Sequence, residues 1–322
     1  MLNQLHTAWR ARRVLIVGRA DRISLFAQAF LAELGARPAR IAPGQDAETL
    51  CRALSEGRVS AILVPCLRAL APEDDLLAQL HALLTLLGEA REAGVPLTLL
   101  CSDAGVYRAG SGSALEEDPL GGQTRDGLIQ SLVQLCADGV SRGLLGDAVS
   151  VQCVRHLPLL GCGHPAVAPY TAWCQALMDN RLIPVEHPGM PGVFLHPLDM
   201  CCGAALLGAR FLSGDTRCTG AFNLGAGAQS LMANRTAALR FIRDNGGTRP
   251  IRETEPPLLP ALPMLCGARA RLLCGAQPIL SGSEALHLLL SLERAARGGQ
   301  AEELAEIDRQ AKHYLTRLAQ EP

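Results

Sequence analysis

The chain has 322 residues, a formal net charge of −1, 48% hydrophobic residues and 19% charged residues. This composition supports a large core and argues against intrinsic disorder, and the near-neutral charge gives no electrostatic basis for binding nucleic acid. No apolar run reaches the roughly 20 residues that a membrane helix needs, and no signal-peptide pattern is found at the N-terminus. We therefore expect a cytoplasmic protein with neither a membrane nor a nucleic-acid partner.

Twelve cysteines are scattered along the chain without any Cys-x-x-Cys pair. Without an export signal, this pattern predicts reduced thiols packed as small apolar groups. Cys162 and His164 are spaced as metal ligands are, but two ligands are too few for a structural zinc. We expect no metal site.

In the first half, short apolar runs alternate with segments of helical periodicity. Strands are predicted at residues 13–18, 39–42, 61–64, 97–101 and 148–154, and helices at 23–34, 47–56, 74–93 and 126–142. The Gly- and Ser-rich residues 108–123 are predicted to form a loop. This alternation predicts an α/β fold, a doubly wound Rossmann-like parallel sheet.

The second half has a less regular pattern. Its predicted elements are a loop at 158–169, helices at 170–180, 199–211, 231–245, 283–296 and 302–318, a strand at 221–224 and a proline-rich linker or loop at 248–263. We expect a Rossmann-like nucleotide-binding domain over residues 1–157 and a smaller mixed C-terminal substrate-type region over 158–322. The elements near 199–245 are expected to pack back on the sheet.

Six segments, taken in order, resemble one family. The most diagnostic is Glu117-Asp-Pro-Leu-Gly-Gly122, and the others are residues 9–18, 101–107, 188–198, 221–225 and 268–278. Together they resemble the extended short-chain dehydrogenases/reductases, the NAD-dependent epimerases and dehydratases, and are most similar to CDP-glucose 4,6-dehydratase. The resemblance implies this family's fold, an NAD cofactor and a nucleotide-sugar substrate.

The resemblance places a phosphate-binding G-x-x-G-x-x-G loop at Gly18, Asp21 and Ser24. Glycines in this loop let the backbone approach a pyrophosphate at a helix N-terminus, whereas Asp21 brings a negative charge there. Two like charges about 4 Å apart repel by about 4 kcal/mol at an effective dielectric constant of 20. We therefore interpret the segment as a strand-to-helix turn with Asp21 at the helix start, and we expect no cofactor, or NAD(P) if the site is functional.

The family's catalytic Tyr-x-x-x-Lys pair is also missing. Alignment from the Gly-Gly segment places Asp126 at the tyrosine position and Gln130 at the lysine position, or Gln123 and Gly127 if the alignment shifts. A carboxylate has a far lower reference pKa than a tyrosine, and the chain's single lysine, Lys312, is near the C-terminus. We expect Asp126 to be a solvated helix cap.

The remaining family positions are partly changed. The resemblance implies that Asp103 is a residual catalytic acid, and Tyr107 is a weak second candidate. Gly192 stands at the family's phosphate-binding arginine and Pro158 at its asparagine, while His196 is kept as a candidate substrate ligand or a buried residue. An arginine makes among the strongest contacts to phosphate, so its loss weakens the case for nucleotide-sugar binding.

Two functions remain open. The first is a degenerate, non-catalytic homologue that binds an unknown small molecule or a protein partner, because a fold without its site does not carry its function. The second is an active NAD-dependent nucleotide-sugar dehydratase or epimerase with a rebuilt site that uses Asp103, Asp126 and Tyr107. The resemblance further implies a homodimer, or pairing with an active paralogue, through the predicted helices at 74–93 and 126–142.

Overall fold

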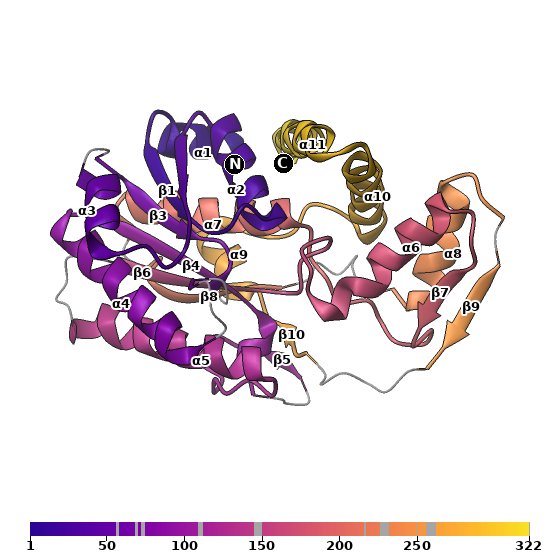
Figure 1. Ribbon diagram of the computed structural model, residues 1–322, viewed down its shortest axis with the longest axis horizontal. Helices are drawn as coiled ribbons and strands as arrows, with labels where there is room; N and C mark the ends of the chain where they lie inside the picture. The colour runs from indigo at the N-terminus through magenta and orange to yellow at the C-terminus, as the bar shows by residue number, and fades with distance from the viewer. Residues whose placement is uncertain are drawn as a thin grey trace.

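A parallel sheet of six strands forms the centre of the computed structural model (Figure 1). The structure describes residues 1–55, 58–67, 70–71, 75–108, 112–144, 150–215, 217–225, 232–248, 250–255 and 262–321. The strands lie in the order β2-β1-β3-β4-β6-β8, with bounds β1 Arg13–Val17, β2 Arg37–Ile41, β3 Ala61–Val64, β4 Leu97–Asp103, β6 Ser150–His156 and β8 Gly220–Leu224. The strand order reverses at β1: β2 lies on one side of it, and β3 and the later strands lie on the other. Open α/β sheets bind ligands at such a switch point, here between β1 and β3.

Strand β1 shows why the central strands are continuous apolar runs. Val14 and Ile16 pack into the core on one face of the sheet, while Leu15 and Val17 pack into the core on the other. A parallel strand covered by helices on both faces is buried on both sides, so its sequence does not alternate with polar residues.

Helices cover both faces of the sheet (Figure 1). One face carries α1 (Leu2–Trp9), α2 (Arg22–Glu33), α7 (Pro197–Leu212) and α11 (Gln300–Gln320), and the other carries α3 (Ala47–Ser55), α4 (Leu76–Glu92) and α5 (Arg125–Gly139). A short helix, α9 (Ala268–Cys274), packs against α7 and β8. No described helix has both the length and the apolar character needed to cross a membrane.

A smaller region lies beside the carboxyl ends of the strands. It contains α6 (Ala168–Met178), α8 (Asn234–Asp244) and the parallel pair β7 (Ile183–Glu186) and β9 (Ile251–Thr254), with a separate aromatic core. Helix α10 (Gly282–Gly298) packs on this region and also on α11, and so joins it to the sheet (Figure 1). The short strands β5 (Ser113–Ala114) and β10 (Met264–Leu265) pair with each other below the sheet.

The structure confirms the predicted doubly wound parallel sheet and the helices that alternate with its strands. Helix α7 and strand β8 pack on the sheet, although both follow residue 157, whereas α8, which also lies within 199–245, packs in the smaller region instead. The loop or linker predicted at 248–263 is wrong for Ile251–Thr254, which pairs with β7, and the loop predicted at 108–123 misses β5. Some predicted positions lie outside the described residues. They are the predicted element ends at Glu56, Asp74, Ala148 and Leu231, and residues 249 and 256–261 of the linker.

Candidate functional site

The turn at Gly18 lies at the carboxyl end of β1, where the sheet order reverses. Asp21 is the N-cap of α2, and its carboxylate accepts a hydrogen bond from the Ser24 amide at 3.0 Å. A Cβ on Gly18 would overlap the hydroxyl of Ser24, which is 1% exposed. Asp21 and Ser24 therefore occupy the start of α2, where a dinucleotide-binding protein presents free amides to a pyrophosphate.

Arg22 links the first turn of α2 to the C-terminal helices α10 and α11. Its Nη1 donates to Glu293 of α10 at 2.5 Å and to the Gly161 carbonyl at 3.0 Å, and its Nε donates to Glu303 of α11 at 2.6 Å. Burial opposes the charge of Arg22, but the hydrogen bonds to both carboxylates raise its pKa overall. Two carboxylates from α10 and α11 therefore surround the first turn of α2.

At the carboxyl end of β4, Asp103 is part of a small polar cluster. Its Oδ1 accepts from the Gly105 amide at 2.7 Å and its Oδ2 accepts from the Gln130 amide group at 3.2 Å. The Nε2 of His164 lies 4.0 Å from the same Oδ2, and its Nδ1 accepts from the Ala166 amide. Because Nδ1 is an acceptor, neutral His164 carries its proton on Nε2, toward Asp103.

The structure thus brings Asp103 and Gln130 together but leaves Asp126 apart. Asp126 is exposed in the first turn of α5, and Thr124, rather than Asp126, caps this helix by accepting from the Gly127 amide. In the shifted alignment, Gln123 is exposed and a Cβ on Gly127 would overlap the Gly105 carbonyl. Of the candidate positions, only Gln130 reaches the end of β4.

The space around Asp103 is small. We call it the crevice; its volume is about 20 Å³, and it is lined by Ile23, Cys66, Cys101, Ser102, Asp103, Gln130, His156, Pro158, Leu159, Cys162 and His164. Such a volume holds about one water molecule, whereas small-molecule sites usually measure roughly 300–1,000 Å³. A nicotinamide ring does not fit in the crevice of this structure.

Sequence reasoning did not identify the histidines of the crevice as neighbours of Asp103. His156 is the β6 residue in register with Asp103, and burial lowers its pKa. Strand register brings His156 beside Asp103, and no local pattern in the chain indicates that register. Among the described residues, no group of three or more His, Cys, Asp or Glu side chains is arranged to hold a metal ion.

The substrate-side candidates occupy three separate places. His196 is the buried N-cap of α7, accepting from the Leu198 amide at 3.2 Å, and burial lowers its pKa to about 3. Pro158 lines the crevice. Gly192 lines a different cavity of about 240 Å³ beside α8 and α10, and a side chain there would overlap the Tyr170 hydroxyl.

Tyr107 lies away from the crevice, in a buried polar network. It is 2% exposed, donates its hydroxyl proton to Asn223 at 2.7 Å and accepts from Arg155 at 2.7 Å. Burial raises the pKa of Tyr107 despite the neighbouring arginine. The hydroxyl is therefore buried and already hydrogen-bonded on both sides, which indicates a structural role and leaves it no contact with a substrate.

No protein-family profile matches the chain, and no curated protein matches its sequence. Solved structures do match its fold. The dTDP-glucose 4,6-dehydratase DesIV of Streptomyces venezuelae, solved with NAD, is 20% identical with a TM-score of 0.68, covering 90% of this chain and 99% of that chain. The epimerase Mth375 of Methanothermobacter thermautotrophicus is 18% identical with a TM-score of 0.71, covering 89% and 93%.

The UDP-glucose 4-epimerase of Thermus thermophilus, also solved with NAD, is 16% identical with a TM-score of 0.69, covering 88% of this chain and 99% of that chain. All three structures match most of this chain's length, but at low sequence identity. This chain therefore has the fold of the extended short-chain dehydrogenases/reductases, as the epimerases and nucleotide-sugar dehydratases do.

Proposed function

We propose that this chain is a non-catalytic protein on the nucleotide-sugar epimerase/dehydratase fold, which binds no NAD(P) and acts through association. The observation that carries the proposal is the small volume of the crevice around Asp103, about 20 Å³. The start of α2 supports it, because Asp21 caps the helix and Glu293 and Glu303 hold Arg22 there. An anionic pyrophosphate at this position meets three carboxylates, which disfavour its binding.

The crevice also lacks the groups for the fold's redox chemistry. Asp103 is bonded to an amide side chain at Gln130, where the family resemblance expects a lysine. An amide neither carries a charge nor transfers a proton near neutral pH. A lone carboxylate beside His164 supports proton transfer but offers no route for a hydride.

A second candidate is an active NAD-dependent dehydratase or epimerase with a rebuilt site. It is favoured by the NAD bound in the DesIV and Thermus structures and by the retained Asp103. Turnover assays with CDP-glucose, dTDP-glucose and UDP-glucose, with NAD supplied, separate the two. The non-catalytic proposal expects no product above a protein-free control, and a product that disappears in Asp103→Asn favours the enzyme.

We propose that the partner is a second copy of this chain, docked on α4 and α5. Both helices face the sheet with buried residues, yet they also carry large apolar side chains on the outside: Leu77, Leu84, Leu128, Leu132 and Leu135 are 37–74% exposed. The two helices lie side by side (Figure 1). An exposed apolar surface of this kind is typical of an interface between protein subunits.

Light scattering on purified protein tests the pairing. The double variant Leu128→Glu/Leu132→Glu should convert a dimer to a monomer, because two charges would be buried without partners. Leu272→Glu is the matched control, since Leu272 is 81% exposed on α9 and should leave the dimer intact. A wild-type protein that is monomeric at micromolar concentration contradicts self-association and redirects the search to a paralogue.

The thiols are consistent with a cytoplasmic location, which we also propose. The twelve cysteines, all among the described residues, form no disulfide bond, and seven of them are buried. Buried thiols contribute packing and are kept reduced in cytosol.

A further inference from the structure

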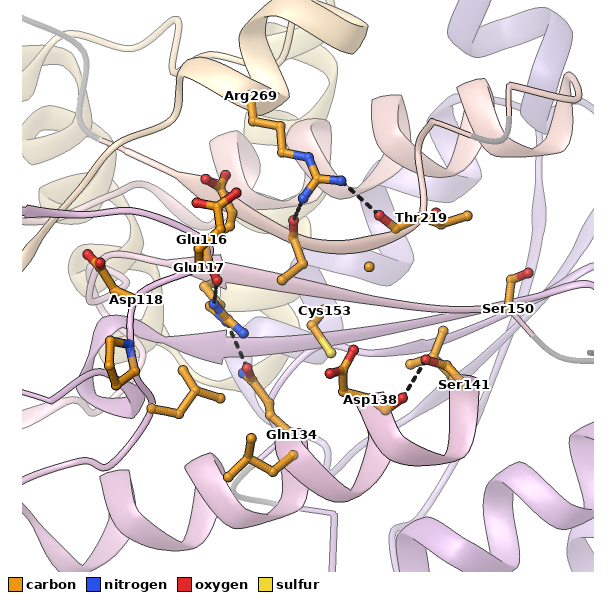
Figure 2. Close-up of a pocket in the computed structure, with 17 residues that line it drawn as sticks. Glu116, Glu117, Asp118, Gln134, Asp138, Ser141, Ser150, Cys153, Thr219 and Arg269 are labelled. Atoms are coloured by element: carbon orange, nitrogen blue, oxygen red, sulfur yellow. Dashed lines mark hydrogen bonds between the residues drawn. The ribbon is translucent and has the colours of Figure 1, made fainter. Parts of the chain in front are cut away.

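A larger cavity lies away from the crevice. It is a groove of about 790 Å³ between α5, the strands β6 and β8 and the loop at 116–120 (Figure 2). The crevice and the groove share no lining residue. Its volume is within the range of small-molecule sites.

The floor of the groove contains a buried positive charge. Arg155 is 6% exposed, and it donates from Nε to Gln134 at 2.8 Å and from Nη1 to the Tyr107 hydroxyl and the Glu116 carbonyl. All three acceptors are neutral. Among the described residues, Arg155 forms no ion pair, and its Nη2 has no hydrogen-bond partner.

A buried guanidinium whose acceptors are all neutral lacks a counter-ion, and a bound anion supplies one. Because Arg155 lines the groove, its Nη2 is the donor that such an anion would meet. A carboxylate binds a guanidinium through short, charge-assisted hydrogen bonds. The floor therefore selects for a negatively charged group.

The rim of the groove has the opposite charge. Figure 2 shows Glu116, Glu117 and Asp118 along one side and Asp138 across from them on α5, with Arg269 above. Arg269 is engaged with the Ala221 and Thr219 carbonyls at 3.1 and 3.2 Å. Glu116 and Asp118 already accept from the Asn223 and Leu115 amides, so Glu117 and Asp138 are the rim carboxylates that favour a cation.

Between the charged ends, the wall of the groove is apolar, with Val151, Cys153 and Ala221 from the sheet. From this arrangement we propose that the groove binds a small zwitterion of the free amino-acid class. Its carboxylate lies on Arg155, its ammonium group lies at the acidic rim, and its apolar body covers β6 and β8.

Thermal-shift measurements and calorimetry with the proteinogenic amino acids test the proposal on the full chain. For an apolar amino acid such as leucine, the paired probes are 4-methylpentanoate, which lacks the ammonium group, and 3-methylbutylamine, which lacks the carboxylate. We expect the zwitterion to bind at least about tenfold more tightly than either probe, the scale of one lost charge-assisted contact. Equal affinity of either probe, or no binding by any amino acid at millimolar concentration, overturns the proposal.

Two variants locate the binding. Arg155→Gln should weaken leucine and 4-methylpentanoate together, and Glu117→Gln/Asp138→Asn should weaken leucine while leaving 4-methylpentanoate unchanged. The rim double variant keeps the test valid if Arg155→Gln does not fold. Asp308→Asn, an exposed carboxylate on α11, is the control; a loss of binding there equal to that of the rim variant overturns the assignment. The groove shares Leu135 with the outer face of α5, but the variants change neither Leu128 nor Leu132, so amino-acid binding and self-association are measured separately.

Discussion

The Nη1 of Arg22, in the first turn of α2, lies 2.5 Å from the Glu293 carboxylate on α10. Glu303 of α11 lies 2.6 Å from Nε of the same guanidinium. These contacts hold helices α10 and α11 against the turn at Gly18, which the sequence resemblance aligns with a phosphate-binding loop. The place of these helices beside the start of α2 is therefore a property of tertiary packing as well as of the loop sequence.

Arg22→Met should destabilise the protein by about 2 kcal/mol, because it leaves two partly buried carboxylates without their donor. The measurement is the free energy of unfolding in urea. Arg52→Met is the matched control, since Arg52 pairs with Glu48 on an exposed helix face and such pairs contribute little. Equal losses in the two variants would show that Arg22 has no special role.

Gly127→Ala should destabilise the protein by about 1–3 kcal/mol, because the added methyl group overlaps the Gly105 carbonyl and forces α5 outward. Gly88→Ala is the control on α4, where nothing lies within 4 Å of the new Cβ, and it should be neutral or stabilising by up to about 1 kcal/mol. Urea unfolding of both variants tests the close approach of α5 to the end of β4. A neutral Gly127→Ala contradicts it.

Tyr107→Phe should lower stability by about 1–3 kcal/mol, because Arg155 and Asn223 lose a buried hydrogen-bond partner. The same variant tests whether Tyr107 is catalytic. If the protein proves active on a nucleotide sugar and Tyr107→Phe abolishes turnover while its unfolding free energy is unchanged, the packing role assigned here is wrong.

Asp199 gives the protein a specific pH dependence. It is buried in the first turn of α7, where its Oδ1 accepts from Tyr314 at 2.8 Å and from the Ile279 amide, and burial raises its pKa to about 7. The folded state thus keeps a proton that the unfolded chain loses near its ordinary pKa of 3.8. This contribution to stability is complete below pH 4 and is lost as the pH rises to 7.

Asp199→Asn should remove this loss, because the amide oxygen still accepts both hydrogen bonds and carries no charge. Its stability relative to wild type should increase from pH 4 to pH 7, by no more than about 1.4 kcal/mol per pH unit, and then level off. Urea unfolding across this range measures the difference. A difference that stays constant with pH would show that Asp199 titrates normally.

Local patterns were enough to predict much of the fold. The run from Val14 to Val17 predicted a strand buried on both faces, and Asp21 was placed correctly at the start of α2. Strand β9 was missed because its four residues lie in a proline-rich segment and gain their strand conformation from pairing with β7. Helix α1 and strand β7 were also not predicted, since each is short.

The site was less predictable than the fold. The absence of the lysine and tyrosine was visible in the sequence, but the contact between Arg22 and Glu293 spans 271 positions and has no local signal. No local signal indicates either that Ser102, Arg155 and Asn223 lie side by side, because they come together from three strands through the sheet register. Contacts between charged side chains that form only through tertiary packing can be identified only from a structure.

Calorimetry with NAD(H) and NADP(H), after mass spectrometry for copurified cofactor, tests the central claim most directly. The small volume of the crevice and the carboxylates around α2 predict no copurified cofactor and no binding at millimolar concentration. Binding at micromolar concentration, or NAD that copurifies with the chain, would contradict the non-catalytic proposal and show that the crevice opens for a dinucleotide.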